Sequence, residues 1–168
     1  MKIDKFIHNL INNLAPRQKE FLVGRFGLAG EEKKTLQELG DRYGITRERV
    51  RQIEAEGLKS VAADFAKSEG VKLIEKAVNY IQLNGGVKKE ADLANELKVL
   101  WDDGALTVNQ IRFLFEVVKN PLCQPEDEKF HAFWYLDKDT FKKADAFAEN
   151  AAKFFANKKE DLISKNKF

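Results

Sequence analysis

Two helical segments, a short one and a longer one, limit what the first part of this chain can form. Each is opened by a threonine, and a glycine turn separates them. Thr35 and Glu38 have the spacing of a capping box, in which hydroxyl and carboxylate each accept a backbone amide. The helix that they open is expected to end at Gly44. Thr46 then caps a longer helix, expected to run to Ala62. Its apolar stripe consists of Val50, Ile53, Leu58 and Val61. Helix, tight turn and helix in this order predict a helix-turn-helix motif.

The polar face of the second helix carries side chains that can recognise DNA bases. Arg can donate two hydrogen bonds to guanine, Gln can pair with adenine, and Glu can accept from cytosine. The candidates for base contact stand near the start of the helix: Arg47, Glu48, Arg51 and Gln52. A plain helical hairpin, in which these charges only solvate one face, is the alternative that the spacing leaves open.

Two further helices are predicted before this motif. Apolar residues recur at helical spacing from Ile3 to Leu14. Pro16 opens a second helix, which Gly27 ends. The polar stretch 28–34 predicts a loop, so residues 1–66 are expected to form a helix-turn-helix domain of four helices.

A second unit is predicted after a short polar hinge, Ser68-Glu69-Gly70. Three helices are expected, at 73–81, 90–100 and 107–119. An aromatic strand then follows a hairpin tip at 125–129, and three helices before a hairpin are typical of a winged helix. The predicted fold class is therefore mainly α. It comprises the helix-turn-helix domain at 1–66, a winged-helix domain with a small β-hairpin at 70–138, and a C-terminal amphipathic helix with a frayed tail at 139–168.

The last predicted helix, from Thr140 to about Lys159, has an apolar face rich in Phe and Ala. Its stripe consists of Phe141, Ala144, Ala148, Ala151 and Phe155, with Phe147 and Phe154 beside it. Such a face can pack on its own domain or form a dimer, and both remain open. Exposure of either flanking Phe would favour a partner.

Composition argues against several classes of function. One cysteine, Cys123, cannot form an internal disulfide, and with His8 and His131 it cannot complete a zinc site, so no metal or cofactor is expected. The sequence contains no catalytic Cys–His arrangement, phosphate-cradling loop or paired-carboxylate site, which predicts a protein that is not an enzyme. Its apolar runs are too short for a bilayer and it has no leader, so a cytoplasmic protein without membrane contact is expected.

Cys123 is expected to be buried, and Trp101 and Trp134 are expected to pack in the core or at its rim.

Four motifs occur in order within the first 54 residues: Leu14-Ala-Pro-Arg-Gln-Lys-Glu-Phe-Leu, Arg25-Phe-Gly-Leu28, Thr35-Leu-Gln-Glu-Leu-Gly40 and Gly44-Ile-Thr-Arg-Glu-Arg-Val-Arg-Gln-Ile-Glu54. Together they closely resemble region four of the sigma-70 family of bacterial transcription initiation factors, over about residues 5–65. The resemblance implies a domain that binds the −35 promoter element in the major groove. It also implies docking on the flap of the RNA polymerase β subunit, with the apolar first helix on either the flap-facing or the interior side.

The same resemblance assigns roles to individual residues. Arg47, Glu48 and Gln52 would contact bases, and Arg51 would contact a base or an adjacent phosphate. The DNA backbone would be contacted by Arg25, Thr35, Thr46 and Lys59. This division follows the general rule that phosphate contacts set the register while base contacts specify the sequence.

Two residues depart from the family pattern. Glu56 and Gly57 stand where the family usually has Lys-Ala. Glu56 replaces a cation with an anion, which weakens the electrostatic attraction to DNA. Gly57 lowers helix stability by about 1 kcal/mol relative to Ala.

The second unit is similar to the HARE-type winged helix, a module that includes the N-terminal domain of the RNA polymerase delta subunit. The similarity lies in segments 73–83, 89–97 and 107–119 and in Phe133-Trp-Tyr-Leu136. Residues 66–168 hold 17 Lys+Arg and 17 Asp+Glu, so the net charge of +2 lies entirely in residues 1–65. A neutral winged helix can bind protein as readily as DNA, and both remain open.

These observations predict a sequence-specific DNA-binding transcription regulator that reads a −35-like promoter element and contacts bacterial RNA polymerase. It would act in the cytoplasm, associated with the nucleoid, and a dimer through the C-terminal helix remains open. The alternative is a polymerase-binding adaptor or sigma competitor that acts through protein–protein contacts and reads little DNA.

Overall fold

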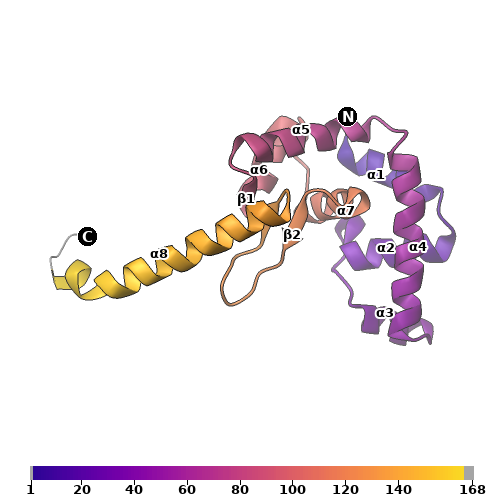
Figure 1. The fold of residues 1–168 in the computed structure, drawn as a ribbon. Helices are drawn as coiled ribbons and strands as arrows, with labels where there is room; N and C mark the ends of the chain where they lie inside the picture. Colours follow the sequence, from indigo (N-terminus) through magenta and orange to yellow (C-terminus); the bar gives the residue numbers. More distant parts are fainter. Residues whose placement is uncertain (1, 165–168) are drawn as a thin grey trace.

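The computed structural model describes residues 2–164, with side chains described as far as Ala156. These residues form eight α-helices, a 3-10 turn and a three-stranded antiparallel sheet. The predicted fold class is confirmed: the chain is mainly α, and the arrangement is consistent with a helix-turn-helix followed by a winged helix (Figure 1).

The first part of the chain forms the four expected helices. They are α1 (Ile3–Asn12), α2 (Pro16–Phe26), α3 (Leu36–Tyr43) and α4 (Arg47–Phe65). The predicted loop after α2 contains the 3-10 turn η1 (Leu28–Gly30). Gly27 and Gly44 end α2 and α3 in the left-handed conformation, as the glycine positions predict. The last helix extends beyond its predicted end because Val61 and Phe65 continue its buried face.

The second unit consists of three helices and three short strands. They are α5 (Gly70–Leu83), β1 (Val87–Lys89), α6 (Glu90–Leu100), α7 (Val108–Val118), β2 (Leu122–Gln124) and β3 (Phe133–Tyr135). The hairpin of β2 and β3 is confirmed, and Cys123 pairs with Trp134 in its register. β3 is central because β1 also pairs with it, so the sheet has one strand more than the predicted hairpin.

The aromatic residues of this unit pack as expected, whereas the cysteine does not. Trp101 and Trp134 are each 4% exposed, and both lie edge-on to Phe115. The expected burial of Cys123 is wrong, since its side chain is exposed. The reason is that β2 is an edge strand, which pairs only with β3.

One hydrophobic core runs through both units. α7 packs against α1, α2 and α4. Phe113 of α7 lies edge-on to Phe26 of α2, with ring centroids 5.2 Å apart. The expected hinge is also closely packed, because a Cβ on Gly70 would lie 2.5 Å from Cζ of Phe6. The division of the chain into domains at residues 1–66, 70–138 and 139–168 stays a prediction.

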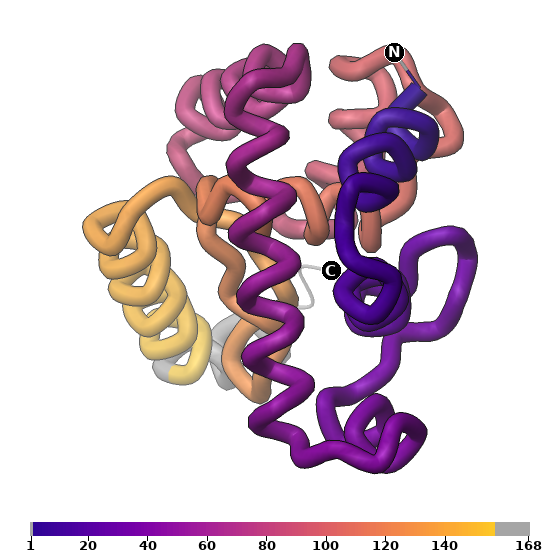
Figure 2. The backbone as a smooth tube through the Cα atoms, turned by 90° about the vertical axis from the view of Figure 1, so that its right-hand side faces the viewer, coloured from indigo at the N-terminus to yellow at the C-terminus, as the bar shows by residue number. Residues whose placement is uncertain are grey.

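The last helix, α8 (Lys138–Ser164), begins on the sheet and then leaves the body of the molecule (Figure 1). Phe141 stacks on Phe133 of β3, with centroids 6.0 Å apart, and contacts Tyr135 at 5.1 Å. Figure 2 shows α8 on the opposite side of the sheet from α1 and α2.

Candidate nucleic-acid interface

Local hydrogen bonds and a small apolar cluster fix the start of α4. The Thr46 hydroxyl accepts the backbone N–H of Arg49 at 3.1 Å, which caps the helix. A Cβ on Gly40 would lie 2.7 Å from the carbonyl oxygen of Ile45, so the absence of a side chain lets the turn close against α3. The buried residues of this cluster are Phe21, Leu39, Val50 and Ile53, packed by Leu36, Tyr43 and Ile45. The orientation of α4 relative to α2 and α3 is therefore held by apolar contacts on its inner face.

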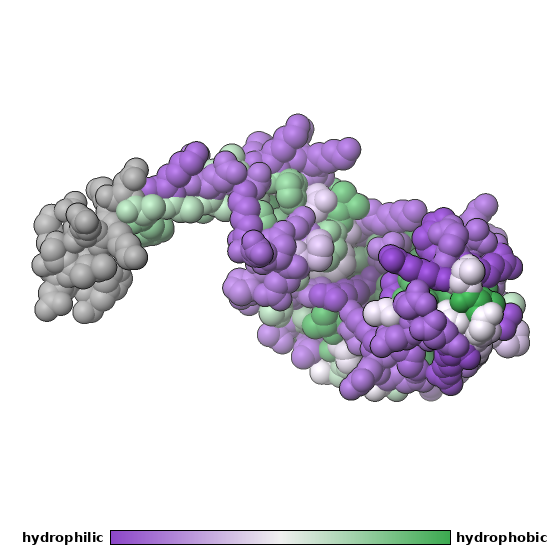
Figure 3. Space-filling model, turned by 90° about the horizontal axis from the view of Figure 1, so that it is seen from below, coloured by the Kyte–Doolittle hydropathy of each residue, from purple (hydrophilic) through white to green (hydrophobic). Residues whose placement is uncertain are grey.

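The outer face of α4 carries the four predicted base-contacting residues. Arg47, Glu48, Arg51 and Gln52 are all exposed, and they share the first two turns of the helix. In Figure 2, α4 runs along the side facing the viewer, and no described segment covers it. The end of the molecule that holds α3 and the start of α4 has a largely hydrophilic surface (Figure 3). A second macromolecule can therefore reach these side chains.

Two of these residues form an ion pair. Nε and Nη2 of Arg51 donate to the Glu48 carboxylate at 2.8 and 2.6 Å. The hydrogen bonds from Arg51 hold the pKa of Glu48 below its usual value, and the same bonds raise the pKa of Arg51. Both groups stay charged at neutral pH, and Arg51 must exchange this partner before Nε and Nη2 can bind a base edge.

Arg49 is a residue of this surface that the sequence analysis missed. Its side chain is exposed, and Nη1 donates to Oε1 of Gln52 at 3.1 Å. Its position between two predicted base-contacting residues is the signal that could have found it. The first two turns of α4 therefore expose three arginines, at 47, 49 and 51, and a single glutamate.

The structure separates the four predicted backbone-contacting residues. Thr35 and Thr46 cap α3 and α4, so their hydroxyls already accept amide protons. Arg25 donates to Glu54 at 3.2 Å and to the Lys34 carbonyl at 2.6 Å. Lys59 is exposed, roughly 18 Å along the helix axis from Arg47 at 1.5 Å per residue. Thr46 directly precedes the predicted base-contacting residues, whereas Lys59 lies towards the other end of α4.

The second unit offers little surface suited to a duplex. α7 follows α6 as the last helix before the hairpin, and most of it is buried against the first unit. Gln110 of α7 donates to Asp4 of α1 at 3.1 Å, and Asn109 donates to the carbonyl of Gly27 at 3.1 Å. The hairpin loop exposes three consecutive acidic residues, 126–128, which would repel phosphates.

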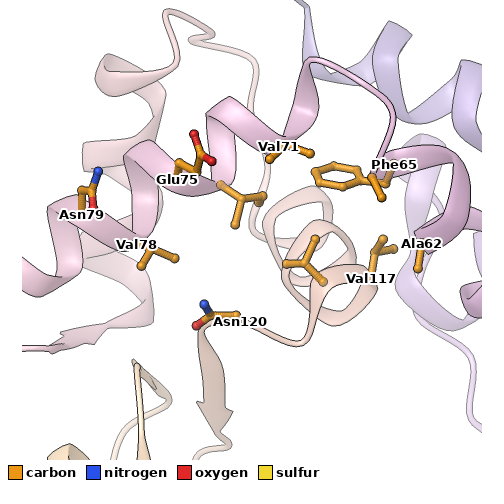
Figure 4. Close-up of a pocket in the computed structure, with 11 residues that line it drawn as sticks. Ala62, Phe65, Val71, Glu75, Val78, Asn79, Val117 and Asn120 are labelled. Carbon is orange, nitrogen blue, oxygen red and sulfur yellow. The ribbon is translucent and has the colours of Figure 1, made fainter.

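A cavity of about 700 Å³ lies at the C-terminal end of α4, between α5 and α7 (Figure 4). Val71, Val78 and Val117 give it a mostly apolar lining, and Glu75 is the one titratable residue among those that line it.

In the part of the chain that the structure describes, no three His, Cys, Asp or Glu side chains are grouped to hold a metal ion. Within the same part, none of the helices has the length and apolarity needed to cross a bilayer.

Comparison with known proteins confirms the resemblance of the first unit. Residues 10–63 match the family model "Sigma-70, region 4". The chain is 56% identical over 52 residues to the RNA polymerase sigma-B factor of Nostoc sp. (strain PCC 7120 / SAG 25.82 / UTEX 2576), a stretch that covers 31% of this chain and 16% of the relative. It is 42% identical over 55 residues to the RNA polymerase sigma factor SigA of Microcystis aeruginosa, covering 33% and 13%. It is 40% identical over 52 residues to the chloroplastic RNA polymerase sigma factor sigF of Arabidopsis thaliana, covering 31% and 10%.

The matched stretch is a small part of each relative, since the chain spans at most 16% of their lengths. It contains the whole of α2, α3 and the turn, and α4 as far as residue 63. The likeness of the second unit to HARE-type winged helices lies outside it and stays a prediction.

Proposed function

We propose that this chain is a non-enzymatic, sequence-specific DNA-binding protein of bacterial transcription, in which α4 enters the major groove of a −35-like promoter element. One observation carries the proposal: the first two turns of α4 expose Arg47, Glu48, Arg51 and Gln52 on one side of a closely packed helix-turn-helix. The match of residues 10–63 to sigma-70 region 4 supports it. Such a protein would act in the cytoplasm at the nucleoid.

The proposed roles follow from the geometry of the side chains. The two arginines can each grip a guanine by two hydrogen bonds, Gln52 can pair with an adenine, and Glu48 can accept from a cytosine. Thr35, Thr46 and Lys59 are proposed to contact phosphates. Arg25 is 28% exposed, so Glu54 can orient its guanidinium while an outer edge reaches the DNA backbone.

Contact with RNA polymerase is the second part of the proposal, and the fold limits where it can occur. The apolar stripe of α1 faces the interior, since Ile3, Ile7, Leu10 and Ile11 are each at most 7% exposed. Docking through this stripe would require α1 to leave the core. A polymerase contact is therefore proposed for the outer surfaces of the first unit.

Selection from a random duplex library tests the DNA-binding role. We expect the full chain to enrich one hexamer similar to TTGACA. The selected duplex should bind the Arg47→Ala variant about 1–3 kcal/mol more weakly, with specificity relaxed at one base pair. Lys76→Ala, which removes an exposed cation from α5, is the control and should keep both affinity and specificity. Equal loss on all sequences for Arg47→Ala would contradict the base-reading role.

Salt dependence separates this function from the adaptor alternative. A DNA-binding protein should lose affinity steeply as the salt concentration rises, because each neutralised phosphate releases counterions. An adaptor should retain polymerase in a pull-down assay while binding duplex DNA weakly even at low salt. That second outcome would overturn the proposal.

A further inference from the structure

The outer part of α8 exposes large apolar side chains to solvent. Phe147 is 76% exposed, Phe154 53% and Phe155 60%. The contacts of α8 with the body come from its beginning: Phe141 packs on the sheet, and Lys129 pairs with Asp145 and with Glu149. In Figure 3 a band of hydrophobic colour continues along the projecting helix beyond the body. Exposed phenyl groups on a projecting helix indicate a surface that a partner covers.

Seven apolar residues of α8 recur at seven-residue intervals. Phe141, Ala148 and Phe155 form one set, Ala144 and Ala151 a second, and Phe147 and Phe154 a third. A seven-residue repeat with apolar residues at three positions keeps the same face towards a partner helix along its length. The repeat therefore suits another helix better than a globular surface.

The sizes of the repeating side chains indicate how two copies would meet. If two α8 helices packed in parallel, each Phe would face the same Phe of the second copy and each Ala would face the same Ala. The Phe layers of such a pair are crowded, and its Ala layers contain cavities. In an antiparallel pair Phe155 faces Ala144 of the second copy, so the outer layers pair a large side chain with a small one, whereas the central layers pair Ala148 with Ala151. Antiparallel packing also puts the two bodies at opposite ends of the helix pair.

Charge and area agree with self-association. Residues 138–164 hold six Lys and five Asp+Glu, so two copies repel little, and an anionic membrane or nucleic acid gains little by binding here. A buried aromatic side chain contributes about 150–250 Å². Scaled by the exposed fractions of Phe147, Phe154 and Phe155, the six phenyl groups of two copies can bury roughly 600–900 Å². The alanines of the same face must supply the rest of the about 1,000 Å² that a specific interface needs.

We propose that α8 is a dimerisation helix that packs antiparallel against α8 of a second copy of this chain. This proposal does not depend on DNA binding. It places one body at each end of a helix pair, and so gives each dimer two separate copies of the α4 surface.

Sedimentation equilibrium of the full chain tests the dimer. We expect a monomer–dimer equilibrium, and both Phe147→Glu and Phe155→Glu should raise the dimer dissociation constant by at least about tenfold while thermal melting of the body is unchanged. Leu83→Glu and Val99→Glu are matched controls, since these side chains are 86% and 82% exposed on other helices, and they should leave the dimer intact. A monomer at every concentration, or a dimer that both Phe variants retain, would overturn the proposal.

Spin labels attached at position 142 test the direction of the pair, in a Cys123→Ser background that removes the one native thiol. In the antiparallel dimer the two labels lie roughly 20 Å apart along the helix axis, whereas a parallel dimer places them side by side. A short label-to-label distance would reject the antiparallel arrangement.

Discussion

The carboxylate of Asp103 accepts the backbone N–H of Ile3 at 2.7 Å, although the two residues are 100 positions apart. Asp103 is 2% exposed, and its second oxygen accepts the N–H of Ala105 at 3.3 Å. The bond satisfies a donor at the open N-terminal end of α1 and places a negative charge at the positive end of the helix dipole. It therefore ties the helix-turn-helix unit to the turn after α6.

Replacement of Asp103 by Asn should weaken the hydrogen bond from Ile3 in a pH-dependent manner. The hydrogen bond from Ile3 holds the pKa of Asp103 below its usual value. A lowered folded-state pKa contributes stability above the unfolded-state value of about 3.9, and the contribution disappears as the pH falls through the folded-state pKa. We expect Asp103→Asn to lower the free energy of unfolding by about 1–3 kcal/mol at pH 7.

Urea unfolding at several pH values measures this effect. The difference between Asp103→Asn and the parent chain should shrink as the pH falls below 4. Asp102→Asn is the control: Asp102 is exposed and has a positive φ of 51°, a conformation that Asn tolerates well. A loss for Asp103→Asn that stays constant from pH 7 to pH 3 would contradict the charged hydrogen bond.

Two buried glycines should respond in opposite ways to replacement by alanine. A Cβ on Gly40 would collide with the backbone carbonyl of Ile45, and we expect a loss of about 1–3 kcal/mol. A Cβ on Gly24 would lie 3.4 Å from a Leu39 methyl group, an ordinary contact, and alanine should favour α2 by up to about 1 kcal/mol. Thermal unfolding compares the two variants, and equal stability would show that the α3–α4 turn has room for a Cβ at position 40.

The local elements of the first unit could be predicted because their signals lie within a few residues. The Thr35 capping box, the left-handed Gly44 and the Thr46 cap each fix a helix end through neighbours in the chain. The exposed face of α4 follows from the same spacing, since Val50 and Ile53 define the opposite, buried face. Sequence reasoning therefore identified which face of α4 is exposed, whereas the roles of the residues on that face stay predictions.

Contacts between distant segments could not be predicted in this way. The apolar stripes of α1 and α7 show that each helix has a buried side but not that they share one core. The hydrogen bond from Ile3 to Asp103 depends on how two remote elements pack. Strand β1 has three residues and no alternating pattern, and only its pairing with β3 defines it.

Removal of the Thr46 hydroxyl should affect stability and DNA binding together. Thr46→Ala removes the bond to the N–H of Arg49 and should cost about 1 kcal/mol of stability. Because the start of α4 then frays, affinity should fall for all duplexes alike. Thr46→Ser keeps a hydroxyl that can cap and should retain both properties. Thermal melting and binding titrations check the pair, and a Thr46→Ala variant with parental stability would mean that the cap contributes nothing.

Neutralisation of Glu48 should strengthen nonspecific DNA binding. In the free protein Glu48 engages Arg51 through two hydrogen bonds, and its own negative charge faces the same solvent as the three arginines. Glu48→Gln removes the repulsion of phosphates and releases Arg51 to bind one. The slope of log affinity against log salt should therefore become steeper by about one unit, and specificity at one base pair should relax. Fluorescence anisotropy on a random and a selected duplex measures both quantities.

Glu75→Gln, at the far end of the molecule on α5, removes an equal charge and should leave the slope unchanged. If both variants change the slope equally, net charge governs binding and the outer face of α4 has no special role in it.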